Sequence, residues 1–358
     1  MSGVILDAAD YNTCVGFGSG LTITSAAECV LVGANAGDAL TSGTKNTALG
    51  ANALSTADTA LYNTAVGFNA MSDVPASQAI DGCVAIGYEA LKGNSSNTTG
   101  LNGTVAIGTE ALSLLTTGTA NIAVGQLACK ILTTGGYNTV VGYRAMDAAD
   151  AGESSNIAIG ASALGAMDEG ASNSCDDNIA IGRNAGLSGA DVTFDSNIAI
   201  GSYALDGTST QDVVNVIAIG RDALGGAAED EVSGTVAIGR DALTSLTTGA
   251  YNTAVGYSAM AGTITGNSNV AIGFGACADM GDTFGHNNVF IGKDAAGGTW
   301  TTEQSDNNVA IGFESMKGAM NNTTYNTCVG SKAGTAIRGD NNTCIGYSAG
   351  DSISTGTQ

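Results

Sequence analysis

The sequence predicts an all-β protein: a parallel β-solenoid (β-roll) of about 19 rungs that assembles as a trimer. The first observation is a motif, Asn-[Thr/Val/Ile]-Ala-[Val/Ile]-Gly-x-x-Ala-[Leu/Met], which recurs 19 times between residues 12 and 350. The second is its spacing of 16 to 22 residues, because self-similarity at a short period indicates stacked repeats. The third is composition: 53 Gly, one Pro and 12% charged residues among 358 exclude collagen and intrinsic disorder.

Each repeat, or rung, is numbered here from its motif Gly at position zero. Position −1 is Val, Ile or Leu and position −3 is Thr, Val or Ile in all 19 rungs, whereas position −2 is Ala in 13 of them. Short β-branched runs that end at Gly predict a strand over positions −4 to −1. The motif Gly residues are 16, 33, 50, 67, 87, 108, 125, 142, 160, 182, 201, 220, 239, 256, 273, 292, 312, 330 and 346.

The two faces of this strand differ in size but not in polarity. Positions −3 and −1 share one face, and positions −2 and zero share the other. Because neither face is polar, both are expected to be buried, and the −1 residues, such as Ile159, Ile219 and Ile272, should form one continuous buried row. A slim coil should bury one face inside and the other against neighbouring chains, most simply around a threefold axis. The sequence does not decide which face goes where, and a monomeric solenoid with a thin core is the alternative.

The trimer is expected because an Ala and Gly face is too small to be left as an aqueous surface on every rung. Asn at position −4 occurs in 14 rungs and suits a corner with left-handed backbone and a side-chain ladder. Gly at position zero suits a tight bend or a close backbone approach at the other corner. Asp and Glu lie mainly in the variable segments, which indicates a solvated acidic coat.

Thirteen of the 18 aromatic residues flank the predicted strand. They form either a sugar-stacking surface or a stacking ladder that shields the corners. Those at position −5 are Tyr11, Tyr62, Tyr137, Tyr251 and Tyr325, and those at position +1 are Phe17, Phe68, Tyr88, Tyr143, Tyr257, Phe274, Phe313 and Tyr347.

The predicted organisation is an N-terminal cap or docking segment (1–11), the solenoid (12–350) and a C-terminal tail (351–358). End rungs leave unpaired backbone groups, so at least one end is expected to dock onto another copy or another fibre or virion component. Cys occurs at position −2 only in rungs 1, 18 and 19, as Cys14, Cys328 and Cys344. We interpret these residues as Ala-sized filler, although Cys328 and Cys344 are close enough for a disulfide.

Charge and residue usage exclude several classes of function. With 33 acidic and 11 basic residues the net charge is −22, which disfavours binding to nucleic acid or to anionic membranes. One His leaves little material for catalysis or a metal site, so no enzyme, no cofactor and no catalytic residue are predicted. The segment Gly346–Gly350 matches the nucleophile elbow G-x-S-x-G, but it is the last copy of the repeat, and His286 lies on a variable segment.

Two further polar patterns have a structural explanation. The triplets that begin at Asp176, Asp306 and Asp340 each end in the motif Asn and offer oxygen ligands for Ca²⁺, but capped turns explain them better. The dipeptides Arg221-Asp222 and Arg240-Asp241 hold the same positions one rung apart, which indicates a surface charge ladder.

The runs Asn156 to Ala163, Asn197 to Ala204 and Asn269 to Ala276 resemble the head repeats of trimeric autotransporter adhesins. That resemblance implies a left-handed parallel β-roll that trimerises. The longer form from Thr247 to Met260 also looks like repeats in tail-fibre proteins of tailed phages. The chain departs from both patterns, since no membrane-anchor barrel, coiled-coil stalk or self-cleaving chaperone domain is seen.

The predicted function is a structural and adhesive fibre protein of a virus particle, a tail or capsid fibre shaft that could attach to a host-surface glycan or protein. No secretory signal is expected from the first residues, and no apolar run is long enough for membrane insertion. Together with eight Cys interpreted as reduced, this favours a virion protein made in the host cytoplasm. The alternatives are a bacterial cell-surface adhesin and a self-assembling extracellular filament subunit.

Overall fold

The computed structural model describes residues 10–74, 80–94, 100–150, 152–166, 175–187, 192–207, 212–226, 232–278, 285–298, 305–318 and 322–353. The chain divides into two compact units, Met1–Asn178 and Ile179–Gln358, and each is described by itself. The predicted cap therefore lies almost wholly, and the tail largely, outside the described residues. No helix in the described residues is long and apolar enough to cross a membrane.

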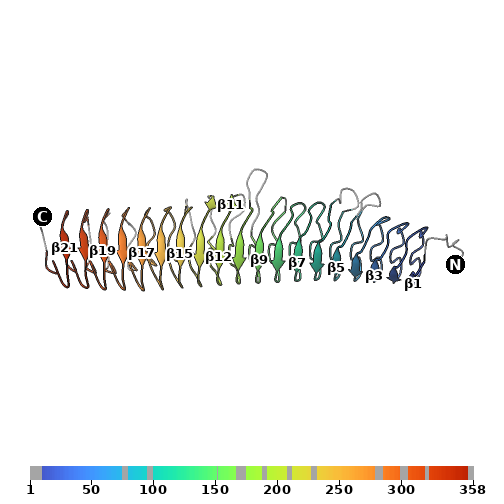
Figure 1. Cartoon of the computed structure of the whole chain (residues 1–358), viewed down its shortest axis with the longest axis horizontal. Coiled ribbons are helices and arrows are strands. Elements are labelled where there is room, and N and C mark those ends of the chain that lie inside the picture. The colour runs from blue at the N-terminus through green and yellow to red at the C-terminus, as the bar shows by residue number, and fades with distance from the viewer. Residues whose placement is uncertain are drawn as a thin grey trace. The chain divides into compact units, whose positions relative to one another are not determined.

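Unit 1 is a stack of three-residue strands, one from each repeat (Figure 1). Its strands are β1 (Thr13–Val15), β2 (Val30–Val32), β3 (Thr47–Leu49), β4 (Thr64–Val66), β5 (Val84–Ile86), β6 (Val105–Ile107), β7 (Ile122–Val124), β8 (Thr139–Val141) and β9 (Ile157–Ile159).

Unit 2 continues the pattern and adds one two-stranded pairing, β11 (Phe194–Asp195) with β13 (Val213–Val214). Its main strands are β10 (Ile179–Ile181), β12 (Ile198–Ile200), β14 (Ile217–Ile219), β15 (Val236–Ile238), β16 (Thr253–Val255), β17 (Val270–Ile272), β18 (Val289–Ile291), β19 (Val309–Ile311), β20 (Thr327–Val329) and β21 (Thr343–Ile345).

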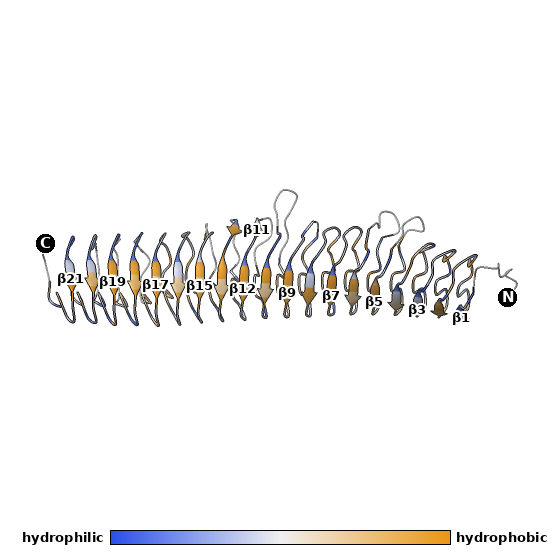
Figure 2. Cartoon of the chain, viewed as in Figure 1, coloured by the Kyte–Doolittle hydropathy of each residue, from blue (hydrophilic) through white to orange (hydrophobic). Residues whose placement is uncertain are grey.

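Within each unit the successive main strands pair in parallel and in register, so equivalent motif positions stack. Ala199 lies opposite Ala218 and Ile200 opposite Ile219, and the same match holds from rung to rung. The strands are mostly hydrophobic, and hydrophilic segments flank them (Figure 2). The predicted all-β parallel solenoid is confirmed. Each strand covers positions −3 to −1 and is one residue shorter than predicted.

The faces of the strand point opposite ways, and the small face is inside the coil. Ala199 and Ala218 at position −2 are 1% and 0% exposed, whereas Ile159 and Ile272 at position −1 are 38% and 39% exposed. The prediction of a buried −1 row is therefore wrong for the single chain, and Ile219 is only half-buried. The argument that a small face must be covered by other chains fails too, because the chain covers that face itself.

The turn after the strand supplies the side chains that fill the coil opposite Ala. In every rung positions zero, +2 and +4 have positive φ, so the chain curls tightly over five residues. This places Ala at +3 and Leu or Met at +4 in the interior, as with Ala223 and Leu224, which are buried. A third buried row comes from position −7, with Ile80 and Leu101 in unit 1. A coil this narrow has no space for an inward Ile at position −1, which explains the correction above.

Within this core, position +4 is Gly or Ala in five of the six rungs whose residue at position −2 is larger than Ala. A Cβ on Gly37 would lie 2.8 Å from Leu31 Cδ2, and Gly334 and Gly350 face the sulfur atoms of Cys328 and Cys344 in the same way. Whenever position −2 carries Cys or Leu, position +4 of the same rung is Gly. The Cys residues near the ends therefore fill space that Gly leaves, as interpreted from the sequence, and Cys328 and Cys344 are free thiols paired in register.

A buried ladder of Asn side chains at position −4 closes the amino corner. Asn63 Nδ2 donates to the Ile80 carbonyl at 2.8 Å, and Asn46 Oδ1 accepts from the Asn63 backbone N–H at 3.0 Å. The predicted ladder is confirmed, but the left-handed residue is the one at position −5, such as Tyr62 with φ of 60°, and not Asn. Cys83 replaces Asn in one rung and donates to the Leu101 carbonyl instead. Burial raises the pKa of the Cys83 thiol to about 11, so it stays protonated.

Candidate interaction surface

Among the described residues, exposed hydrophobic side chains recur on the outer face, defined as the side chains at positions −3 and −1 of the main strands. In unit 1 its exposed members include Val30, Leu49, Ile122 and Val141, and in unit 2 they include Ile181. Position −1 is Val, Ile or Leu on every rung and position −3 is Val, Ile or Thr, so the outer face is a mainly apolar strip two side chains wide along each unit. Contiguous exposed apolar area of this kind marks an association surface in soluble proteins.

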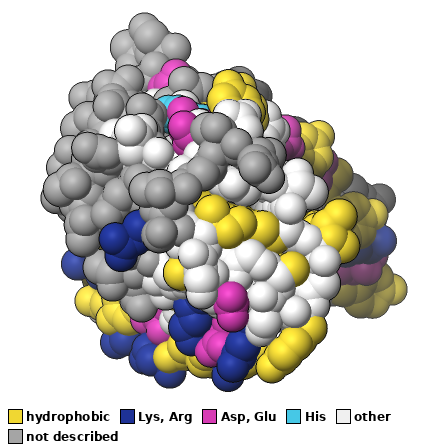
Figure 3. Space-filling view, turned by 90° about the vertical axis from the view of Figure 1, so that its left-hand side faces the viewer, with side chains coloured by type: hydrophobic (Ala, Val, Ile, Leu, Met, Phe, Trp, Pro, Cys, Tyr) yellow, Lys and Arg dark blue, Asp and Glu magenta, His cyan; other side chains and the backbone are white. Residues whose placement is uncertain are grey.

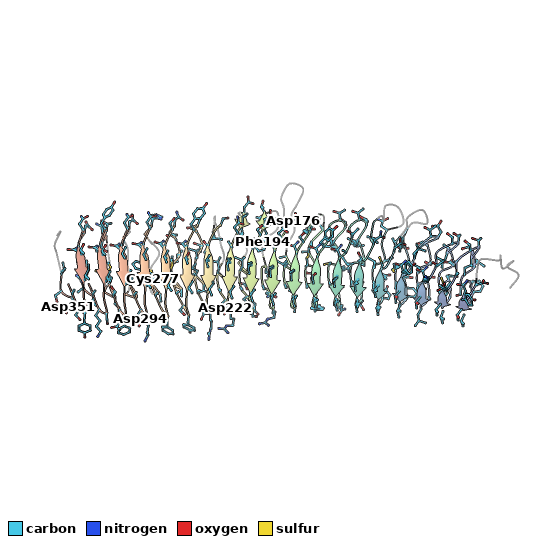
Figure 4. The ribbon with its side chains drawn as sticks, in the orientation of Figure 1. Asp176, Phe194, Asp222, Cys277, Asp294 and Asp351 are labelled. Carbon is cyan, nitrogen blue, oxygen red and sulfur yellow. The ribbon has the colours of Figure 1, made fainter. Side chains whose placement is uncertain are left out.

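The outer face is bordered by two columns, the amino edge column at position −5 and the carboxyl edge column at position +1. In Figure 4, unit 2 shows the labelled Asp222 and Asp294 beyond the carboxyl ends of the strands and Phe194 beyond their amino ends. The carboxyl edge column of unit 2 contains both cations and aromatic rings. Its middle part reads Arg240, Tyr257, Phe274, Lys293 and Phe313.

These side chains stack directly on each other from rung to rung. Tyr257 and Phe274 have ring centroids 5.2 Å apart and planes 9° apart. Arg240 lies 5.6 Å from the centroid of Tyr257, and Lys293 lies 5.6 and 5.7 Å from those of Phe274 and Phe313. Each contact is a cation–π or offset-stacked pair. The part of the column from Arg240 to Phe313 is thus a ladder in which rings are stacked against neighbouring rings and cations.

Three flanking rings of unit 1 have partners of the same kind. Phe68 and Tyr88 stack with centroids 5.8 Å apart, and Lys45 lies 5.2 Å from the Tyr62 centroid. A sugar that stacks on an aromatic side chain needs a free ring face. In these pairs the geometry therefore favours the stacking ladder over the sugar-stacking surface, whereas Tyr137, Tyr251 and Tyr325 at position −5 are 69%, 65% and 61% exposed.

Basic side chains concentrate beyond the carboxyl ends of the strands. Nine of the 11 basic residues lie at positions +1, +2 or +5. Arg221 Nε lies 3.1 Å from Asp222 and Arg240 Nε lies 3.1 Å from Asp241, while the Arg221 guanidinium reaches Asp241 one rung on at 4.0 Å. Figure 3 shows Lys and Arg mainly along the left and lower edge of this view, with some Asp and Glu among them. These dipeptides form the surface charge ladder inferred from the sequence, and exposed pairs of this kind add little stability.

The residues considered for metal binding or catalysis serve the backbone of neighbouring rungs. Asp306 and Asp340 accept backbone N–H groups of His286 and Thr324 at 2.6 and 2.7 Å, and Asp176 does the same for Ser154. These are the capped turns expected as the alternative to Ca²⁺. In the part of the chain that the structure describes, no three His, Cys, Asp or Glu lie close enough together to hold a metal ion.

The structure does not bring His286 and the apparent elbow serine together. His286 lies at position −6 of its rung, where its Nδ1 accepts the Asn267 backbone N–H at 3.1 Å. Ser348 lies at position +2, on the opposite edge and three rungs further on. That no enzyme activity and no cofactor exist remains a prediction.

No protein-family model matches the chain, and a comparison with curated proteins finds no match.

One carboxyl group makes the stability of unit 2 depend on pH. Burial, and then the charge of Asp222, raise the pKa of Asp206 from 3.8 to about 6. Because the folded state holds this proton more tightly than the unfolded state, its stabilising contribution is present below about pH 4 and is lost as pH rises through about 6. Above that range the ionised carboxylate destabilises the fold.

We therefore expect Asp206→Asn to raise the stability of unit 2 at pH 7 by about 1 kcal/mol or less, after allowance for solvent screening. At pH 4 the gain should be smaller. Thermal unfolding of the variant and the parent at both pH values measures the effect. Asp351→Asn, at the same position of the last rung but exposed, is the matched control. An equal gain at both pH values would contradict the assignment.

Proposed function

We propose that the chain is a structural fibre protein of a virus particle, whose copies associate through the outer face as a homotrimer. The observation that carries this proposal is the apolar outer face itself, because side chains such as Ile159 and Ile272 are left exposed in both units of the single chain. Stacked rungs give a surface that repeats along each unit, which suits a shaft. Cyclic homo-oligomers are the usual way to cover such a surface.

The state of the Cys residues supports assembly in a reducing compartment. None of the eight Cys residues, which all lie in the described part of the chain, forms a disulfide, and seven of them are buried. Disulfides form and persist in oxidising compartments, whereas thiols persist in the cytoplasm. A virion protein that is made and assembled in the host cytoplasm is consistent with that pattern. A surface adhesin or an extracellular filament subunit spends its functional life in oxidising surroundings.

The mass in solution tests the association. Light scattering in reducing buffer at pH 7 should give a mass close to three times the 35.1 kDa of one chain. A mass of one chain at all concentrations would refute the association, and a mass that grows without limit would favour the filament. Antibody labelling then separates the remaining classes, since a virion protein labels purified particles and an adhesin labels intact cells of the producing bacterium.

The ends of the stack and the attachment to a host are further parts of this proposal. All three residues of β1 are exposed, including Cys14. We propose that this end docks onto another fibre or virion component. Host attachment would use the polar edges of the rings and the variable segments. Binding of fluorescent protein to candidate host cells, before and after periodate oxidation of their glycans, distinguishes a glycan from a protein receptor.

A further inference from the structure

The two edge columns carry a pattern that contacts within one chain do not explain. On any rung the amino edge residue and the carboxyl edge residue lie on opposite sides of the strand. The strand alone separates them by about 10 Å, so their side chains do not touch within the chain. Each column contacts its own neighbours above and below, as Tyr257 does with Phe274.

Nevertheless the two columns are matched on several rungs. Four of the five Tyr residues in the amino edge column share their rung with Phe or Tyr in the carboxyl edge column. Where the amino edge residue is Gly, two of the three partners are large, Tyr88 opposite Gly82 and Arg240 opposite Gly234. The aromatic rungs are Tyr11 with Phe17, Tyr62 with Phe68, Tyr137 with Tyr143, and Tyr251 with Tyr257.

Inside the coil, two positions of one rung whose residues are matched in size are also in contact. Positions −2 and +4 compensate in volume, and the structure shows that they touch, since a Cβ on Gly37 would strike Leu31. The same logic applied to the edge columns requires a contact between two chains. The required partner is another copy of this chain, placed so that its amino edge meets the carboxyl edge of the first.

Rotational symmetry between identical copies places an amino edge next to a carboxyl edge. Consider copies related by a rotation axis that is parallel to the stacking direction, with their outer faces turned toward that axis. In this arrangement the strands of every copy point around the axis in the same sense, each toward the next copy. The carboxyl edge of one copy then meets the amino edge of the next at the same height. We propose that the copies associate in parallel and in register, with each amino edge residue contacting the carboxyl edge residue of the same rung in the neighbouring copy.

The available area is sufficient for a stable assembly. Eighteen outer-face side chains in unit 1, at on the order of 50 Å² each, expose on the order of 900 Å² per copy, which reaches the ~800 Å² per partner of a stable interface. The apolar strip supplies the hydrophobic contact but is nearly the same on every rung, so it does not fix the register between copies. The edge columns differ from rung to rung, and they would set the register. This inference rests on the self-association proposed above.

Paired Cys substitutions in the full-length chain test the register. In a Cys14→Ala background, Tyr251→Cys combined with Tyr257→Cys places both thiols on the same rung. After oxidation with copper phenanthroline, a non-reducing gel should show covalent multimers up to the closed trimer. Ala120→Cys with Gln126→Cys repeats the test in unit 1 without the loss of an aromatic contact. Each single variant should stay largely unlinked.

A pair on different rungs is the matched control. Tyr251→Cys with Phe313→Cys offsets the thiols by three rungs, or about 14 Å, beyond the reach of a disulfide. The mass of each reduced variant is measured first. A single-chain mass for the parent refutes self-association and this inference together. A trimeric mass without same-rung crosslinks, or with equal crosslinking in the offset pair, overturns the register and leaves the association intact.

Discussion

Gly273→Ala is expected to destabilise unit 2 by more than about 3 kcal/mol, because it combines backbone strain with a buried steric clash. Gly273 is a motif glycine with φ of 139°, a conformation that residues with a Cβ rarely adopt. A Cβ there would lie 2.5 Å from the Gly292 carbonyl oxygen of the next rung. Because that neighbour is backbone, it can move only if the strand pairing opens.

The measurement is the midpoint of urea unfolding, followed by circular dichroism and by protease cleavage of unit 2. Gly103→Ala in unit 1 is the control, since Gly103 has φ of 70° and an added Cβ would meet nothing within 4 Å. That change should cost about 1 kcal/mol, the usual penalty of left-handed backbone. Equal effects of the two substitutions would show that φ alone, and not the stacking of glycines, explains the invariant Gly.

The fold was predictable because its causes are local and repeated. A β-branched triplet ended by Gly specifies a strand in each rung, and 19 copies leave no other way to bury them. The ladder of Asn at position −4 was also predictable, since a buried amide needs partners and an identical amide lies one rung away. The structure shows this with Asn46 and Asn63.

The direction of the two faces was not predictable from the strand itself. Ile219 and Ala218 are both apolar, so polarity does not say which one points inward. The deciding factor is the volume of the coil, and this depends on the turn, where positive φ at +2 and +4 sends Leu224 inside. The sequence did hold a signal that was missed. Leu31 with Gly37 and Cys328 with Gly334 show that position −2 contacts position +4 inside the coil.

The candidate interaction surface exists because positions −3 and −1 point outward and not into the coil. Aromatic residues at positions −5 and +1 were expected at the corners, where a stacking ladder was one of the two interpretations, but their cationic partners were not foreseen. The contacts of Lys293 with Phe274 and Phe313 exist because equivalent positions stack in register, which places a cation between two rings. Such contacts depend on the residues one rung above and one rung below, and not on the local motif.

The second large expected effect is on stability and follows from the orientation of the two faces. It is tested by substitutions at adjacent positions of the same two strands. Ala199→Gln with Ala218→Gln places two amides in the packed interior of the coil, where both parent side chains are buried. Overpacking and unpaired polar groups should together cost about 3–5 kcal/mol. We expect the rungs around β12 and β14 to unfold, so that assembly is lost because the chain is no longer folded.

Ile200→Gln with Ile219→Gln is the matched pair on the outer face, one residue further along the same strands. In the single chain both side chains are only half-buried, so the fold should lose about 1 kcal/mol or less per site. In an assembly these positions face another copy, and the trimer should dissociate into folded chains. Circular dichroism reads the fold and light scattering reads the mass. If the Ala variant stays folded while the Ile variant unfolds, the two faces are reversed and the apolar strip has no role in association.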